Sequence, residues 1–382
     1  MKFAKCLFCC AVLTAAVGTV SYAEPRFART EEEWAALEDD RLEYAEIPDL
    51  VHEYNIEVLK ANKEYNDFIK KYGKTKSDVS EQYREMADEL EDSMTGEDGM
   101  GIVTDYNLQL QADKLREQAD DNLEDSYIYY QQNCKAEAEI VRQAQQNFLK
   151  YLIKQAELLI AEDECNSLSL TLGRRQDEFK YGLAVETDVL KAEEAYEKKR
   201  KEIKEIEQEI ESLRQELIIA CGWKATDNPV IGYDYPPTSS DYGWVTDINL
   251  EEATQDAWSS NYDLKINSRK LENAEDADNI ELLTKTVEDN KNRIRANLEM
   301  SYRALQTAYR NYKQSVKDLS TAQRDNEDSV LKQRLGLVSV NDAEQSRIAV
   351  EKQQKVVEKN EFLLVSAIED YNAQKYGLAS IS

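Results

Sequence analysis

The sequence predicts an all-α protein in which long antiparallel coiled-coil helical hairpins form two structural repeats. Three observations support this prediction. Only 12 Gly and 5 Pro occur in 382 residues, so long segments contain no residue that breaks a helix. Apolar residues in those segments recur at the 3-4 spacing of a coiled-coil seam. Finally, Gly-Leu followed after four residues by Asp occurs at Gly182 and again at Gly336, 154 residues later (336 − 182).

Residues 1–23 have the pattern of a secretory signal peptide. Lys2 and Lys5 precede an apolar run from Cys6 to Val20, and Ser21-Tyr22-Ala23 forms a small-x-small cleavage site. We therefore expect an exported chain, with a net charge of −30 after the two lysines leave (−28 − 2). No later segment approaches the ~18 uninterrupted apolar residues of a membrane-spanning helix, so we expect no transmembrane helix in the mature chain.

Charge and composition argue against several functions. With 76 acidic and 48 basic residues, the surface is a poor partner for nucleic acid. His52 is the only histidine, and no phosphate-binding or dinucleotide fingerprint occurs, so we expect no enzyme, no metal site and no cofactor. Cys134, Cys165 and Cys221 remain after export and are too far apart for a metal motif. We expect small buried thiols rather than a disulfide.

The first half divides into a polar N-terminal segment, 24–46, and a helical repeat, 47–222. Trp34 and Leu37 are the candidate anchors of the polar segment, and Gly73 ends the first helical stretch. An extra insert at about 71–122 contains a short amphipathic helix over 78–94 and a Gly-rich loop over 96–101.

The long helices of the first repeat flank Gly182. No Gly or Pro lies between Gly101 and Gly173, which permits one continuous helix. The expected seam before the tip consists of Tyr127, Tyr130, Cys134, Val141, Ala144, Phe148, Tyr151 and Leu158. After the tip it resumes at Val189, Ala192, Tyr196, Ile203, Ile206, Ile210, Leu213, Leu217 and Ala220, with Lys199 as its one polar member, and Gly222 ends it.

A connector over 223–247, rich in Pro, Gly and aromatic residues, leads to a second helical repeat over 248–382. Its seam keeps the offset of 154 from the first repeat, which indicates an internal duplication. The seam residues before the second tip are Leu298, Tyr302, Leu305, Tyr309, Tyr312, Val316 and Leu319. Near the start of each repeat, Asn261 corresponds to Asn55 at an offset of 206 rather than 154, so the first repeat carries about 52 extra residues (206 − 154).

An exported, duplicated helical chain with these tips resembles the TolC family of outer-membrane efflux proteins. The phrases that carry the resemblance are Phe179-Lys180-Tyr181-Gly182-Leu183, Thr187-Asp188-Val189-Leu190-Lys191-Ala192-Glu193, their second-repeat counterparts, and Leu250-Glu251-Glu252-Ala253 followed by Asn261-Tyr262-Asp263-Leu264-Lys265. The resemblance covers most of 47–382. It implies a homotrimeric tunnel of twelve helices, fed by an inner-membrane pump through a membrane-fusion (adaptor) protein.

The family places two membrane strands ahead of the long helix of each repeat, and no alternation of apolar and polar residues marks them here. We therefore expect a TolC-like relative without an evident β-barrel. Its expected location is the cell envelope, which in a cell lacking an outer membrane means outside the cytoplasmic membrane.

The resemblance also assigns functions to tip residues. The adaptor-docking positions would be Gly182, Leu183, Gly336 and Leu337. Asp342 would contribute to a cation-selecting acidic ring at the entrance, with Thr187 and Asp188 at the matching place in the first repeat. The family has Arg and a second Asp where this chain has Val338 and Gln345, which indicates an incomplete entrance network.

Simpler explanations exist for the same residues. Asp188 and Asp342 begin helices, where a carboxylate satisfies free backbone N–H groups, and Ser339-x-x-Asp342 and Asn341-x-x-Glu344 are possible capping pairs. Each Gly-Leu pair could be only a turn with its usual hydrophobic contact. Two functions therefore stay open: a passive conduit or adaptor-docking component of an efflux or secretion system, and a non-transporting elongated scaffold or spacer of the cell envelope.

Overall fold

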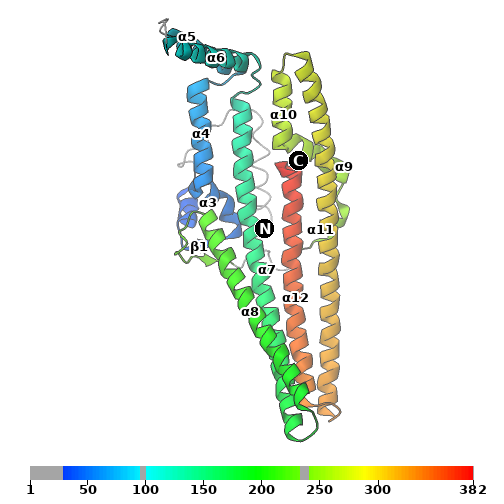
Figure 1. Ribbon diagram of the computed structural model, residues 1–382. Coiled ribbons are helices and arrows are strands. Elements are labelled where there is room, and N and C mark those ends of the chain that lie inside the picture. The colour runs from blue at the N-terminus through cyan, green and yellow to red at the C-terminus, as the bar shows by residue number, and fades with distance from the viewer. Residues whose placement is uncertain (1–28, 95–99, 233–240, 382) are drawn as a thin grey trace.

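A computed structural model describes residues 29–94, 100–232 and 241–381 (Figure 1). The expected signal peptide, residues 96–99 of the Gly-rich loop predicted over 96–101, and part of the connector lie outside the described residues, whereas Met100 and Gly101 belong to a helix rather than to the loop. The first half contains α2 (Glu31–Leu37), β1 (Arg41–Leu42), η2 (Tyr44–Glu46), α3 (Ile47–Tyr54), α4 (Ile56–Tyr72), α5 (Lys76–Asp92), α6 (Met100–Asp120), α7 (Ser126–Lys180) and α8 (Glu186–Ala220). The second half contains β2 (Val230–Ile231), η3 (Gly243–Asp247), α9 (Leu250–Ser260), α10 (Tyr262–Asn273), α11 (Ala277–Arg334), α12 (Val340–Ala373) and η4 (Gln374–Leu378).

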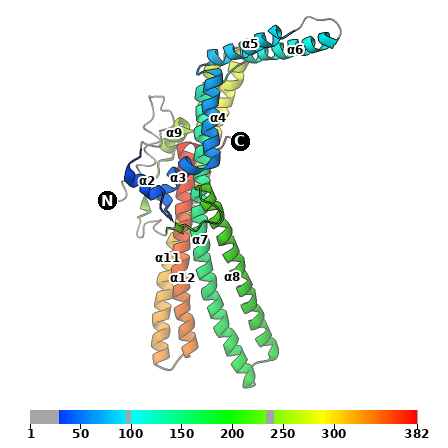
Figure 2. The same cartoon turned by 90° about the vertical axis from the view of Figure 1, so that its left-hand side faces the viewer.

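Two long antiparallel hairpins, α7–α8 and α11–α12, form the length of the molecule (Figure 1). Contacts between neighbouring helices run in the order α8, α7, α12, α11, which makes one layer with α8 and α11 at its edges. Both tips lie at the same end of this layer, and the hairpins diverge toward it (Figure 2). The predicted all-α class of long helical hairpins is therefore confirmed.

A hydrophobic core holds the middle of the layer together. It draws fully buried side chains from both hairpins and from the short front helices, including Ile47, Leu50, Phe148, Leu149, Leu152, Leu217, Leu298, Leu305 and Leu364. The Tyr44 ring meets the Phe148 ring edge-on, with centroids 5.4 Å apart. Removal of these apolar groups from water is the main stabilising contribution to the layer.

The expected seam is out of phase at several positions. On α7 the buried residue is Ile128, whereas the predicted Tyr127 is exposed. On α11 Ser315 is buried, whereas the predicted Val316 is exposed. The two deviations are one residue each and in opposite directions, so they are local: α7, for example, packs on α4 and α10 as well as on α8 and α12, and one seam count does not show which neighbour covers a given side.

The stretch from Gly101 to Gly173 is not one continuous helix, although the absence of Gly and Pro permits one. The helix α6 ends at Asp120 and α7 begins at Ser126. Asp125 caps α7 by accepting a hydrogen bond from the Ile128 N–H at 3.1 Å, and the chain turns there. Absence of Gly and Pro permits a long helix, but an internal N-cap can still divide it.

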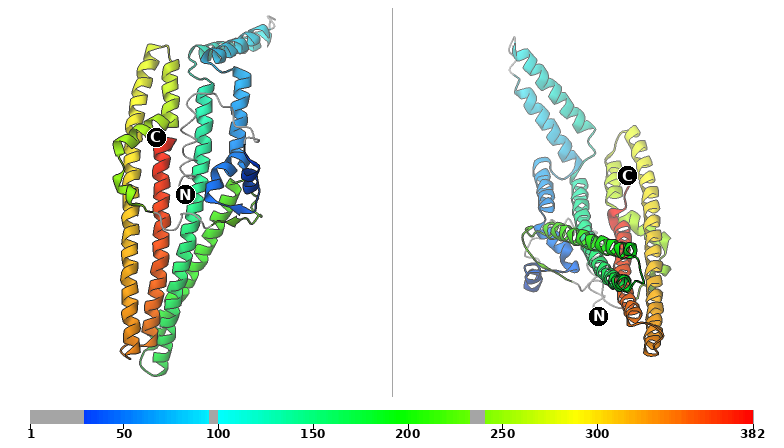
Figure 3. Two further views of the ribbon diagram at one scale, coloured as in Figure 1. Left: turned by 180° about the vertical axis from the view of Figure 1, so that it is seen from behind. Right: turned by 60° about the horizontal axis from the view of Figure 1, so that its bottom comes forward.

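The helices α5 and α6 form a hairpin that we call the arm. The predicted helix over 78–94 corresponds to α5, which begins two residues earlier. The arm leaves the end of the molecule opposite the tips and extends across the long axis (Figures 2 and 3). It lies on the α4 side, away from α10 and α11.

The N-terminal segment and the connector pack on the helices. Leu37 is buried and Trp34 packs against the core, as predicted for the two anchors. The strands β1 and β2 pair in parallel, Arg41 opposite Val230, a contact between distant segments that no local pattern predicts. In the connector, Tyr242 is buried and its ring lies edge-on to Tyr312.

Cys134, Cys165 and Cys221 are free thiols. Only Cys221 is fully buried, and burial raises its pKa to about 12, which suppresses its reactivity. Cys134 and Cys165 are half-buried, less covered than predicted. None of the helices in the described ranges is both long and apolar enough to cross a membrane.

Candidate docking site at the helix tips

Both tips turn by the same hydrogen-bond pattern. At the first, the Gly182 N–H donates to the Phe179 carbonyl oxygen at 3.0 Å and the Leu183 N–H donates to the Glu178 carbonyl oxygen at 2.7 Å. At the second, the corresponding distances are 3.0 Å from Gly336 to Gln333 and 2.9 Å from Leu337 to Lys332. This is the Schellman arrangement, in which a left-handed residue ends the helix.

The glycines are required by the backbone rather than by space. Gly182 has φ +73° and Gly336 has φ +69°, values that L side chains rarely adopt. A Cβ at either position would meet nothing within 4 Å, so the tip surface is open there. A larger residue would strain the turn and would also project into any molecule bound at the tip.

The leucines that follow the glycines do not pack back on their helices. Leu183 is 79% exposed and Leu337 is 71% exposed. In a Schellman turn this position usually makes a hydrophobic contact with the helix. The contact is not formed here, so the alternative that each Gly-Leu pair is only a turn with its usual hydrophobic contact is not supported. Other large apolar side chains at the tips are also exposed: Phe179, Tyr181, Val185, Leu190, Leu331, Leu335 and Val340.

The tips differ in how the following helix begins. At the second tip, Ser339 and Asp342 form a reciprocal capping box: the Asp342 N–H donates to Ser339 Oγ at 3.1 Å, and the Ser339 N–H donates to Asp342 Oδ2 at 3.2 Å. At the first tip the N-cap is Val185, which has no side-chain acceptor. Asp188 therefore lies in the first turn of α8, where its negative charge favours the helix dipole, but it makes no capping hydrogen bond.

The remaining predicted capping pair is not formed. Asn341 lies within α12, whose N-cap is Ser339, and Glu344 pairs with Arg347 at 2.6 Å instead. Thr187 is exposed in the first turn of α8, beside the half-buried Asp188. Hydrogen bonds from Ser339 and the nearby charge of Arg174 lower the pKa of Asp342, so its carboxylate is ionised at neutral pH.

Polar side chains join the two hairpins near the tips. Arg174 Nη1 on α7 lies 3.7 Å from Asp342 Oδ1. Farther from the tips, Ser167 Oγ donates to Gln345 Oε1 at 2.5 Å and Gln345 Nε2 donates to the Ser167 carbonyl oxygen at 3.1 Å. Gln345, one of the departures from the family pattern, therefore contacts the other hairpin.

The polar contacts continue toward the core. Glu164 on α7 pairs with Lys199 on α8 at 2.8 Å and with Lys352 on α12 at 2.6 Å. Lys355 pairs with the nearly buried Asp163 at 2.8 Å. Lys199, predicted on sequence grounds to be the one polar seam residue, thus belongs to a network that spans three helices.

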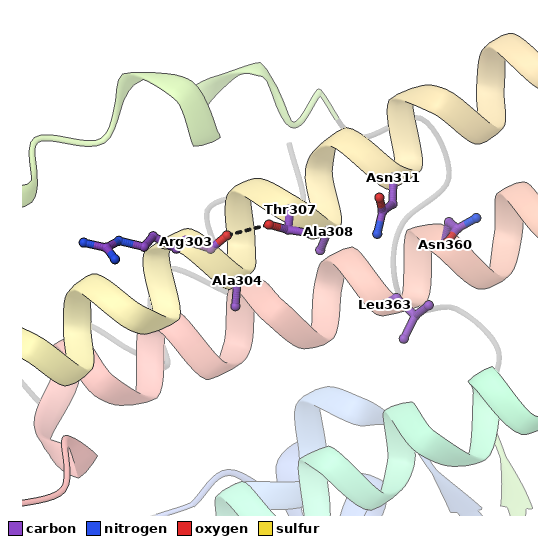
Figure 4. Close-up of a pocket in the computed structure, with 7 residues that line it drawn as sticks. All are labelled: Arg303, Ala304, Thr307, Ala308, Asn311, Asn360 and Leu363. Atoms are coloured by element: carbon purple, nitrogen blue, oxygen red, sulfur yellow. Dashed lines mark hydrogen bonds between the residues drawn. The ribbon is translucent and has the colours of Figure 1, made fainter.

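A shallow groove of about 440 Å³ lies between α11 and α12 (Figure 4). It is lined by Arg303, Ala304, Thr307, Ala308, Asn311, Asn360 and Leu363. The Thr307 hydroxyl donates to the Arg303 carbonyl oxygen at 2.9 Å, so it is used within its own helix. The groove brings together no acid, base and nucleophile, and the tips remain the better candidate site.

Solved structures share this architecture. The chain superposes on the Campylobacter jejuni CmeC outer membrane channel with a TM-score of 0.55 and 10% identity, over 92% of this chain and 89% of that one. The chain has a TolC-like fold. The channel-forming protein CusC gives a TM-score of 0.51 at 9% identity over 87% and 92% of the two chains. A membrane protein from Pseudomonas aeruginosa gives 0.52 at 10% over 87% and 93%. No protein-family model matches the sequence, and no curated protein matches it either.

Within this TolC-like fold, the predicted site residues lie together at one end. The structure adds residues that sequence analysis did not single out, namely Arg174, Ser167 and the exposed apolar side chains around each leucine. Arg174 and Ser167 carry no local signal, because their partners lie on the other hairpin. The exposed apolar residues at the turns could have been found from the sequence. They lie next to the glycines that end the helices, outside the seam that pairs the two helices of a hairpin, so packing within the hairpin does not explain them.

Proposed function

We propose that this protein is an exported, passive helical conduit, or the adaptor-docking component of an efflux or secretion system in the cell envelope. It would act as a homotrimer, and the hairpin of an adaptor protein would dock at Gly182, Leu183, Gly336 and Leu337. The observation that carries the proposal is the pair of exposed leucines, in the same turn geometry and at the same end. Solvent-exposed leucine is stabilised by burial against a partner.

The acidic tip residues have a secondary function in this proposal. Thr187, Asp188 and Asp342 would favour cations at the entrance, and the acidic composition of the chain supports such a preference. Asp342 also caps α12, so substituting it would change helix stability together with charge.

The docking proposal is tested by binding. We expect the double substitution Leu183→Ser and Leu337→Ser to weaken capture by the immobilised helical hairpin of an efflux-pump adaptor by at least about tenfold, the scale of an interface anchor. Ile219→Ser, at an exposed site on α8 far from the tips, is the matched control and should bind like the parent. Equal capture of all three proteins would refute docking at the leucines.

The conduit and the scaffold differ in assembly. Light scattering coupled to size-exclusion chromatography of the exported chain should give a trimer if the layer closes into a tunnel. A monomer or a dimer would refute the conduit and favour an elongated envelope spacer.

A further inference from the structure

Equivalent helices of the two hairpins are covered differently. The first long helices, α7 and α11, end at Lys180 and Arg334, which are 154 residues apart (334 − 180). The second long helices, α8 and α12, follow the N-caps Val185 and Ser339, which are also 154 residues apart (339 − 185). In the middle of the layer α7 packs on α12, whereas α11 and α8 are the two edges. A first helix of one hairpin therefore packs on a second helix of the other hairpin only in the middle of the layer.

Polar contacts join α7 to α12 along most of their length. The ion pairs are Arg142–Asp370 at 2.9 Å, Glu157–Lys359 at 3.8 Å, Asp163–Lys355 at 2.8 Å, Glu164–Lys352 at 2.6 Å and Arg174–Asp342 at 3.7 Å. The hydrogen bonds between Ser167 and Gln345 belong to the same series. These contacts identify the side of each helix that faces the other hairpin.

The equivalent sides of the two edge helices are bare in the described part of the chain. Adding 154 to the α7 residues of these contacts gives positions on α11 that are all exposed: Ala296, Asn311, Lys317, Asp318, Thr321 and Asp328. Subtracting 154 from the α12 residues gives positions on α8 that are exposed except for the half-buried Asp188: Lys191, Lys198, Lys201, Glu205 and Glu216. Each edge thus presents to solvent the side with which the middle helices hold the hairpins together.

We propose that the two edges bind each other between copies: α11 of one copy packs on α8 of a second copy as α7 packs on α12 within the chain. This inference rests on the proposed oligomer and names its contact. A contact between unlike edges is head to tail, and it closes into a ring when the rotation per copy allows it. The alternation of helix direction continues across the contact, because α11 runs toward the tips and α8 runs away from them.

One charged pair is reproduced at the proposed contact. Glu164 and Lys352 correspond to Asp318 and Lys198, so the acid stays on the first helix and the lysine on the second. Lys198 forms no ion pair with another described residue. Asp318 accepts a hydrogen bond from Gln314 of its own helix at 2.8 Å and is otherwise open to solvent. Both charges are therefore available to a second copy.

Two equivalent pairs join like charges and limit the extent of the contact. Lys317 would face Lys201, whose charge is already offset by Glu205 of its own helix at 3.5 Å. Asp328 would face Asp188 at the tip end, where the hairpins diverge (Figure 2). Like charges in contact are destabilising. We therefore expect the copies to meet from Asp318 toward the core and to stay apart at the tips.

Disulfide formation between copies tests the contact. Asp318→Cys with Lys198→Cys, in the full exported chain with Cys134, Cys165 and Cys221 changed to alanine, should give linked species of two and three chains on non-reducing denaturing gels. Within one chain the two positions lie on opposite edges of the layer, too far apart for the Cα separation of below about 7 Å that a disulfide needs.

The matched control pairs Asp318→Cys with Arg200→Cys. Arg200 is exposed, and it lies two residues from Lys198, about 200° around α8 at 3.6 residues per turn. The control should link much less than the first pair. Linking of Asp318→Cys with Lys198→Cys that is no stronger than in the control would overturn the contact.

Charge exchange gives an independent readout. Asp318→Lys should raise the concentration at which the oligomer dissociates by about fivefold or more, because it places two lysines in contact, and added Lys198→Asp should restore the parent value. Glu327→Lys, an exposed position about 180° around α11 from Asp318, is the control for added charge. Equal effects of Asp318→Lys and Glu327→Lys, or no restoration in the exchanged pair, would contradict the contact. A trimer that shows neither linking nor restoration overturns this contact alone, whereas a monomer overturns the proposed oligomer as well.

Discussion

The two tips offer a test of helix capping within one chain, because they share a turn and differ in one cap. Ser339 has φ −74° and ψ 161°, and Val185 has φ −101° and ψ 156°, so both are in N-cap conformation. Only Ser339 supplies an oxygen, which accepts the Asp342 N–H at 3.1 Å. Ser339→Ala should therefore destabilise the start of α12, and Val185→Ser should stabilise the start of α8.

The magnitude follows from the bonds involved. Loss of a side-chain N-cap costs about 1 kcal/mol, and the reciprocal bond from Asp342 loses its geometry at the same time. Because the tip is far from the core, the change should appear as local opening rather than as global unfolding. About 1 kcal/mol corresponds to about fivefold in an opening constant.

Amide hydrogen exchange is the appropriate assay. Exchange of the Asp342 amide, which donates to the cap hydroxyl, should become about fivefold faster in Ser339→Ala, and exchange of the Asp188 amide should become about fivefold slower in Val185→Ser. Ser346→Ala, later in α12, is the control and should leave exchange of the Asp342 amide unchanged. Unchanged exchange of the Asp342 amide in Ser339→Ala would refute the capping argument.

Two further predictions concern the body of the molecule. His52 Nδ1 lies 2.8 Å from Glu137 Oε1, and this bond raises the His52 pKa. The pair therefore stabilises the fold below pH ~6.5, and the stabilisation is lost as pH rises through the raised pKa. Glu137→Gln should flatten the pH dependence of the unfolding free energy measured in urea, and an unchanged pH dependence would contradict the argument. Phe148→Ala should lower the unfolding free energy by about 3–5 kcal/mol in the same assay, because the ring is fully buried in the core. Leu183→Ala, at the exposed tip, should change it by less than about 0.5 kcal/mol. Similar losses for both variants would contradict the described burial.

Sequence analysis recovered the helical hairpins because their signals are local. Helix ends at Gly182 and Gly336 follow from the left-handed backbone that glycine alone adopts readily, and α5 was found from its amphipathic spacing. The internal duplication, inferred from a constant offset, stays a prediction. The errors were single-residue errors of phase, such as Tyr127 in place of Ile128, because a local count does not show which neighbouring helix covers a given side.

The candidate site divides in the same way. Its turn residues could be predicted, because a Schellman turn depends on five or six consecutive residues. The exposure of Leu183 and Leu337 could not, since exposure depends on what the rest of the chain covers. Neither could the contact between Arg174 and Asp342, which joins residues 168 positions apart (342 − 174).

The sequence by itself determined the two long helical hairpins and the turns at Gly182 and Gly336, because capping, propensity and seam periodicity act over a few turns of backbone. Only the tertiary structure decided the order α8, α7, α12, α11, the polar contacts between the hairpins and the direction of the arm. Those features depend on side chains such as Glu164 and Asp125, whose partners are distant in sequence. A local pattern shows that such a residue is polar, but not which helix it will meet.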